Sequence, residues 1–405
     1  MSRKWLTWPI VGLLLGLFAA VSLYGEAQQF EFRYRDGERY RILSTVDQEV
    51  RINGRLSHQA RILNRIAIEV TAVDGDRGTI EATFRTSEEA FRAGQVFAWG
   101  EDYTSRFERD ARGYYDIEPH YFMPVVRDVP VFPEHELAPG DTWTAEGSEV
   151  HDFRRGFGIP EAFHFPITVH YRYAGREERD GKKLDVIEMR YNVLHRPEGV
   201  RTRQVYPHTI TGYADQRLYW DNLAGRPHSY EEDYALVFAL TDGRTFEFSG
   251  TAEARVVESD PLDRDALRTE IERDLEERGV EDTRVASDDD GVTISLENIQ
   301  FAPDSDELLL SERAKLDAIA EILLRYPDRD IMVTGHTALA GTEAGRRQLS
   351  ERRAQVVGQY LLDSGVRTTD QIMTRGFGAQ RPVADNDTAE GRRRNRRVEI
   401  TIMEH

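Results

Sequence analysis

The chain has 405 residues, of which 40% are hydrophobic and 31% are charged, and it contains no cysteine. This length favours two domains, because one hydrophobic core rarely serves so long a chain. The formal net charge of -19 argues against a nucleic-acid partner, because phosphate binding needs clustered positive charge. Without cysteine the chain cannot form disulfides, thiolate metal sites or a lipid-modified N-terminal cysteine.

The first residues have the pattern of an export signal. Arg3 and Lys4 precede an apolar stretch at 10–21, and Gly25 and Ala27 are small residues suited to cleavage. We therefore predict a signal peptide over 1–27 and a mature chain that begins near Gln28. An uncleaved membrane anchor is the alternative, because 5–23 is almost long enough to span a bilayer.

The region 28–258 is predicted to be a β-rich domain. Tyr40, Ile42 and Val46 alternate with charged residues, which is typical of a strand with one wet face, and Asn53-Gly54 predicts a hairpin turn. Similar runs follow at 62–73, 79–86, 167–173, 184–194, 210–220, 230–240 and 245–257.

Two architectures fit these strands, a soluble antiparallel sheet or sandwich and a transmembrane barrel. A barrel needs strands whose lipid-facing side is continuously apolar. Glutamates recur through the strands instead, at Glu69, Glu81, Glu188, Glu232 and Glu253. The pattern therefore favours a sandwich or open sheet.

The last part of the chain alternates between helix and strand patterns. Helical spacing of apolar residues begins at Leu262 and ends at Gly279, and further helices are expected before Pro327 and over 342–363. Strands are expected at 292–296, 331–335, 372–377 and 398–402. We therefore predict a domain over 259–405, with its core at 291–405, built as an α/β sandwich with the helices on one side of the sheet.

Six short blocks carry a family resemblance, and they stand at 299–301, 335–337, 349–354, 376–378, 381–382 and 395–399. In order and spacing they resemble the OmpA-like, peptidoglycan-associating domain. The resemblance covers only the last third of the chain. It implies a pocket where the second strand enters the following loop and helix, which grips a peptidoglycan stem peptide through its diaminopimelate residue.

The resemblance also implies which residues bind the ligand. An arginine and an aspartate of the family together read a carboxylate and an ammonium group. Arg353 holds the arginine position, whereas Ala338 holds the aspartate position and Arg346 replaces a family asparagine. The implied ligand-binding residues are Thr337, Ala338, Arg346, Arg353 and Arg397, with diaminopimelate capture altered by the loss of the acid.

Helical geometry directs Arg353 toward the sheet. At 100° per residue, Arg353 falls inside an apolar arc that contains Leu349, Val356 and Tyr360. One interpretation is an anion clamp at the mouth of the pocket. The other is a packed side chain whose head pairs with a carboxylate such as Glu343.

No catalytic signature was found, and neither a cofactor nor a metal site is expected. His336 is predicted to be a packed residue at a strand end. The sequence predicts a non-enzymatic cell-envelope protein, in the periplasm or associated with the outer membrane, that tethers to or senses peptidoglycan. The β-rich domain would contact other envelope proteins. Alternatives are an interaction scaffold that no longer binds peptidoglycan, or an outer-membrane β-barrel with a periplasmic wall anchor.

Overall fold

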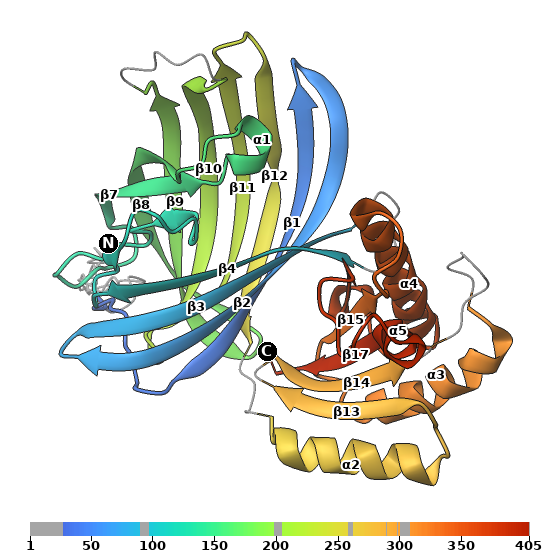
Figure 1. Cartoon of the computed structure of the whole chain (residues 1–405). Helices are drawn as coiled ribbons and strands as arrows, with labels where there is room; N and C mark the ends of the chain where they lie inside the picture. The colour runs from blue at the N-terminus through green and yellow to red at the C-terminus, as the bar shows by residue number, and fades with distance from the viewer. Residues whose placement is uncertain are drawn as a thin grey trace, which may run out of the picture.

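The computed structural model describes residues 27–89, 97–197, 205–257, 262–288, 290–297, 299 and 308–404. The predicted signal peptide and most of the block at 299–301 lie outside these residues. The chain forms a large N-terminal sheet and a smaller C-terminal domain with helices and a sheet of its own (Figure 1). None of the helices in these described ranges is both long and apolar enough to cross a membrane.

The N-terminal sheet is antiparallel throughout. Its strands are β1 (Arg39–Ile52), β2 (Arg55–Asp74), β3 (Arg77–Glu89), β4 (Phe97–Arg109), β5 (Tyr115–Ile117), β6 (Val126–Arg127), β7 (Thr142–His151), β8 (Phe163–Arg179), β9 (Lys182–His195), β10 (Pro207–Asp221), β11 (Arg226–Leu240) and β12 (Thr245–Val257). Neighbours along the chain pair as hairpins from β2 to β5 and from β6 to β12, and β1 joins the two halves by pairing with both β2 and β12. The predicted turn is present, since Asn53 and Gly54 both have positive φ, at 51° and 74°.

The expected antiparallel all-β architecture is confirmed, and it takes the form of one strongly curved sheet in place of two separate ones. Strands β2 to β4 cross in front of β8 to β11, so the concave face closes over its own core (Figure 1). Aromatic side chains fill this core, including Phe30, Phe132, Tyr173 and Trp220. The short helix α1 (Arg154–Phe157) contributes Phe157 to it.

The C-terminal domain contains α2 (Arg264–Glu277), β13 (Thr283–Asp288), β14 (Gly291–Glu297), α3 (Leu310–Leu323), β15 (Ile331–His336), α4 (Glu343–Asp363), the 3₁₀ turn η1 (Thr369–Gln371), β16 (Ile372–Gly378), α5 (Ala389–Asn395) and β17 (Arg397–Met403). Its strands pair in the order β13–β14–β17–β15–β16, and only β15 and β16 are parallel to each other. One apolar cluster joins these strands to the helices, and it contains Ile271 of α2, Ile319 of α3 and Val357 of α4 together with Ile400 of β17.

Sequence patterns missed β13 and α5. Strand β13 is short, and its inward residues include only one large aliphatic side chain, Val285. Helix α5 has seven residues, three of them arginine, so no apolar stripe marks it. Both elements are stabilised by neighbours that are distant in sequence, β14 for the strand and the loop at 383–386 for the helix.

The two sheets meet edge to edge. Strand β4 pairs in parallel with β16, at Phe97 with Met373 and Ala98 with Thr374. The N-terminal sheet therefore covers the free edge of the small sheet beside the strands that carry the predicted binding residues.

Candidate functional site

The predicted ligand residues centre on the carboxyl ends of β15 and β16. The backbone N–H of Thr337, just after β15, donates to the carbonyl oxygen of Gly378 at 2.8 Å, and the N–H of Gly378 donates to Oγ of Ser350 at 2.8 Å. Gly378 has a φ of 54°, and a Cβ there would lie 3.4 Å from Cβ of Arg346. Thr337, Gly378 and Arg346 are therefore immediate neighbours.

A buried asparagine holds the surrounding loops. Oδ1 of Asn395 accepts hydrogen bonds from the backbone N–H groups of Val383 and Ala384, at 2.8 Å and 3.0 Å. Its Nδ2 donates to Oδ1 of Asn386 at 3.0 Å, and the same oxygen accepts from the N–H of Leu339 at 3.0 Å. The loops after β15 and β16 are thus tied together. Asn395 lies in a motif block, but sequence gave no sign of this role.

Three of the predicted residues keep unsatisfied polar atoms, and two of them, Thr337 and Arg346, lie at this site. Oγ1 of Thr337 and Nε of Arg346 are both buried and have no hydrogen-bond partner. Thr337 is only 7% exposed, and Ala338 beside it is 6% exposed. Arg346 is half-buried, and its Nη1 donates to the carbonyl oxygen of Gly341 at 2.5 Å. Buried polar atoms are rarely left without a partner, so both atoms are candidates for contact with a ligand.

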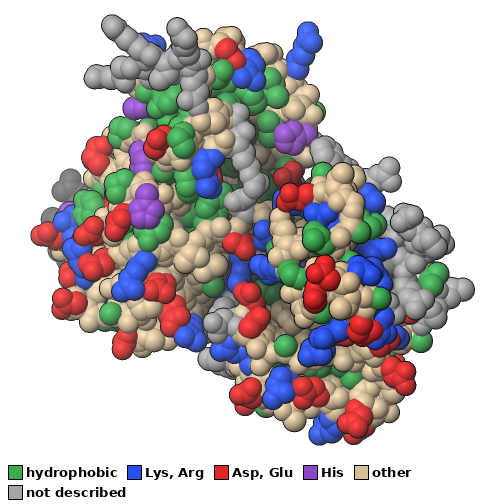
Figure 2. Space-filling model, in the orientation of Figure 1, with side chains coloured by type: hydrophobic (Ala, Val, Ile, Leu, Met, Phe, Trp, Pro, Cys, Tyr) green, Lys and Arg blue, Asp and Glu red, His purple; other side chains and the backbone are tan. Residues whose placement is uncertain are grey.

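The local charge favours an anion. Helix α4 begins at Glu343, capped by the side chain of Thr342, and carries Arg346 and Arg347 in its second turn. Cations near a helix N-terminus are opposed by the helix dipole, whereas an anion is stabilised there. No ion pair in the described ranges involves Arg346, although basic and acidic side chains are interspersed elsewhere over this domain (Figure 2).

Arg353 lies on α4 two turns beyond Arg346 and is half-buried. Arg353 already has an interaction partner within the protein. Arg353 stands beside the buried stripe of α4, which consists of Ser350, Ala354, Val357, Gly358 and Leu361, so its inward orientation stays a prediction. Its contact with a ligand stays a prediction.

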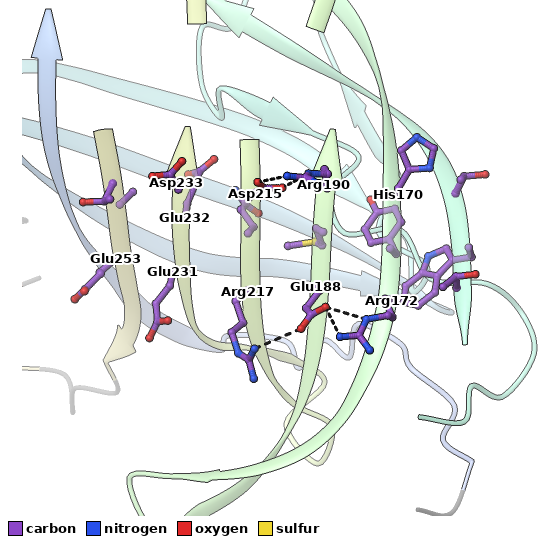
Figure 3. Close-up of a pocket in the computed structure, with 18 residues that line it drawn as sticks. His170, Arg172, Glu188, Arg190, Asp215, Arg217, Glu231, Glu232, Asp233 and Glu253 are labelled. Carbon is purple, nitrogen blue, oxygen red and sulfur yellow. Dashed lines mark hydrogen bonds and ion pairs between the residues drawn. The ribbon is translucent and has the colours of Figure 1, made fainter. Parts of the chain in front are cut away.

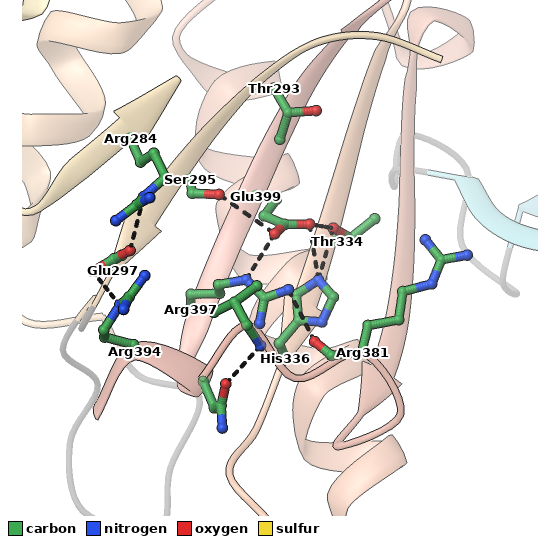
Figure 4. Close-up of polar contacts among 12 residues, drawn as sticks. Arg284, Thr293, Ser295, Glu297, Thr334, His336, Arg381, Arg394, Arg397 and Glu399 are labelled. Carbon is green, nitrogen blue, oxygen red and sulfur yellow. Dashed lines mark hydrogen bonds and ion pairs between the residues drawn. The ribbon is translucent and has the colours of Figure 1, made fainter. Parts of the chain in front are cut away.

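Arg397 belongs to a second polar network on β15 and β17 (Figure 4). Its Nε donates to Oε1 of Glu399 at 2.7 Å and its Nη2 to the carbonyl oxygen of Arg381 at 3.1 Å, while its Nη1 is buried without a partner. Nε2 of His336 lies 3.1 Å from Oε2 of Glu399. Arg397 and Glu399 alternate with Val398 and so point away from the helix-covered core.

The pKa values of Glu399 and His336 in this network are both shifted downward. Burial alone would raise the pKa of the Glu399 carboxyl, but the hydrogen bonds and positive charges of His336 and Arg397 outweigh it and lower the pKa to about 2. Burial lowers the pKa of His336, which is 2% exposed and packs against the ring of Phe377. His336 is therefore a packed strand-end residue, as predicted.

A depression with a volume of about 1080 Å³ lies elsewhere, on the outer face of β7 to β12 (Figure 3). Arg190 pairs with Asp215 at 2.5 Å, and Glu188 pairs with Arg172 at 2.7 Å and with Arg217 at 3.4 Å. These ion pairs involve all three arginines of the lining, while the lining also includes the acids Glu231, Asp233 and Glu253. No sequence motif pointed to this depression.

Comparison with known proteins finds relatives of the part of the chain that contains β15 and β16. Residues 300–396 match the model of the OmpA family. Outer membrane porin F of Pseudomonas aeruginosa is 37% identical over 105 residues, 26% of this chain and 30% of its own length. Peptidoglycan-binding protein ArfA of Mycobacterium tuberculosis is 38% identical over 104 residues, 26% of this chain and 32% of its own.

Among solved structures, an outer membrane protein from Borrelia burgdorferi B31 is 36% identical and covers 30% of this chain and 96% of its own, with a TM-score of 0.26. The chain spans about a third of the length of the curated relatives above, 30% and 32%. The region at 300–396 of this chain is therefore a domain of the OmpA family, and no family is assigned to the β-rich region before it.

Proposed function

We propose that this protein is a non-enzymatic component of the cell envelope that associates with peptidoglycan in the periplasm through its OmpA-family domain. The family match and the name of the mycobacterial relative support the class of partner. The observation that carries the proposal is the pair of buried, unpartnered atoms at Thr337 and Arg346, on either side of Gly378. The outer surface of the N-terminal sheet would remain available to other envelope proteins.

The proposed ligand group is a carboxylate of the stem peptide. Oγ1 of Thr337 and Nε of Arg346 can both donate to an anion, and the N-terminus of α4 favours one. Ala338 offers only a methyl group where the family has an aspartate, so an ammonium group would find no carboxylate at that position. We therefore expect carboxylate recognition without the second contact to diaminopimelate, and we propose Arg353 as a further anion-binding residue.

Co-sedimentation of the full-length protein with purified sacculi tests this proposal. The parent protein should sediment with the sacculi. Arg346→Gln and Arg353→Ala should each weaken binding about tenfold or more, because each removes a shielded, charged hydrogen bond. Arg352→Gln is the matched control, since it removes a charge from the same helix next to Arg353 and should bind like the parent.

Ala338→Asp gives a test with the opposite sign. A restored carboxylate should strengthen binding to diaminopimelate-containing muropeptides by about 1 to 3 kcal/mol in titration calorimetry. Tight binding that neither Arg346→Gln nor Arg353→Ala alters would refute the proposed anion site. If neither the parent nor Ala338→Asp binds sacculi or muropeptides, the domain is an interaction scaffold and the proposed function is wrong.

A further inference from the structure

Arg65 of the N-terminal sheet is buried at the junction with the OmpA-family domain. Its Nε donates to Oδ2 of Asp330 at 2.7 Å, and both side chains of this ion pair are only 6% exposed. Its Nη1 donates to Oγ of Ser87 at 3.2 Å, and its Nη2 donates to the backbone carbonyl oxygen of Asp370. One guanidinium on β2 therefore contacts two separate segments of the other domain.

Those two segments are the starts of the strands that carry the candidate site. Asp330 directly precedes β15, and Asp370 lies in η1, directly before β16. The two strands run in parallel from Ile331 and Ile372, so both begin at Arg65. Their opposite ends lead to Thr337 and Gly378. Each strand is only six or seven residues long, so a shift at its start would be transmitted to the site.

Further contacts hold the same end of the small sheet. Strand β4 adds backbone pairing to β16 at Met373 and Thr374. Arg85 pairs with Asp290 at 2.5 Å, and Arg375 of β16 lies 3.5 Å from Asp102 of β4. The guanidinium of Arg375 also covers the ring of Phe377, the residue before Gly378, at 4.9 Å. Contacts from the N-terminal sheet therefore hold the first half of β16, and Arg375 relays them to Phe377 near its end.

A buried ion pair is an expensive way to join two surfaces, because both charges lose their hydration. Such a pair is useful where the relative position of the two surfaces matters, because its free energy is favourable in one arrangement and unfavourable in others. Arg65 meets this description, because its planar guanidinium reaches three acceptors at fixed angles, and a lysine could not reproduce them.

We propose that Arg65 is a positioning residue for the candidate ligand site, and that the N-terminal sheet is thereby a working part of the peptidoglycan-binding unit. Arg65 fixes the relative position of β15 and β16 at their starts, and this sets the spacing of Thr337 and Gly378 at their ends. The inference rests on the proposed function for the effect on binding, whereas the effect on the strands can be measured without any ligand.

Amide hydrogen exchange on the full-length protein, combined with sacculus binding, tests this. Arg65→Met should accelerate exchange in β15 and β16 about tenfold, while exchange in α2 and β9 stays at the parent rate. The same variant should weaken sacculus binding about tenfold, although Arg65 touches no ligand. Arg61→Met is the matched control on the same strand, because Arg61 is exposed and pairs with Asp47 within the N-terminal sheet, so its loss should change neither readout.

Arg65→Lys keeps the positive charge and covers the case in which Arg65→Met does not fold. It should give a smaller acceleration in the same two strands and intermediate binding. Parent-like exchange in β15 and β16 in either folded variant would overturn the inference, and so would accelerated exchange with unaltered affinity. If the parent itself does not bind sacculi, the proposed function fails, and the exchange data alone decide whether Arg65 positions the strands.

Discussion

The carboxyl of Glu232 should make the free energy of unfolding fall as the pH rises toward neutrality. Glu232 lies on β11 with its side chain on the concave face, between the aromatic residues Tyr230 and Tyr234 of the core. Burial raises the pKa of this carboxyl to about 7, with the hydrogen bond of Gln216 opposing the shift and the charge of Glu149 adding to it. Glu149 is itself 2% exposed and has one unpartnered oxygen.

The sign and the size of this pH effect follow from the pKa of Glu232 in the unfolded and in the folded protein. The unfolded chain ionises this group near its ordinary pKa of 4.5, whereas the folded protein keeps the proton until about pH 7. Between these values only the folded state holds the proton, so raising the pH favours unfolding. A shift from 4.5 to about 7 corresponds to about 3 kcal/mol, lost progressively over this window and constant above it.

Glu232→Gln removes the titration and nearly preserves the shape of the side chain. Urea unfolding of the parent and the variant should be followed from pH 4.5 to pH 8. The variant should match the parent at the acid end and exceed its stability by about 2 to 3 kcal/mol at pH 8. Glu231→Gln is the matched control, because Glu231 points outward and pairs with Arg179. A difference between Glu232→Gln and the parent that does not change with pH would refute this reasoning.

Other predictions concern the C-terminal domain. The pKa of the Glu399 carboxyl is lowered to about 2, so its stabilising contribution is complete above its ordinary pKa of 4.5 and is lost as the pH falls toward 2. Between pH 7 and pH 2 the parent should therefore lose more of its stability than Glu399→Gln does, as followed by circular dichroism during acid unfolding. Equal pH profiles of the two proteins would contradict this. Gly378→Ala should cost about 1 to 2 kcal/mol in thermal unfolding, because the φ of 54° strains any Cβ and the added methyl would lie 3.2 Å from the backbone nitrogen of Arg347; a variant as stable as the parent would rule out this strain. Asp330→Ala should lower the free energy of unfolding by about 3 to 5 kcal/mol, because it leaves Arg65 buried without its carboxylate partner. The double variant Arg65→Met with Asp330→Leu should recover most of this free energy in urea unfolding. Simple additivity of the two single changes would show that the pair is not coupled.

Local patterns determined much of this protein. Alternation of polar and apolar residues located the long strands of the N-terminal region, because side chains on a strand point to opposite faces in turn. The helix predicted over 342–363 is α4 (Glu343–Asp363), since its cap Thr342 and its apolar stripe are both close in sequence. The family resemblance named Thr337 and Arg346 together, and the fold brings both against Gly378.

Tertiary structure alone decided how these elements combine. Pairing of β1 with β12 and of β4 with β16 joins segments about 200 or more residues apart, and no local pattern encodes which distant edge a strand will meet. The ion pair of Arg65 with Asp330 spans 265 residues, so sequence showed two ordinary surface charges where the fold buries both. Arg397 was grouped with the ligand residues by its motif, yet the pleat of β17 turns it into the network of Glu399 and His336. In each case the deciding interaction is between residues brought together only by long-range packing.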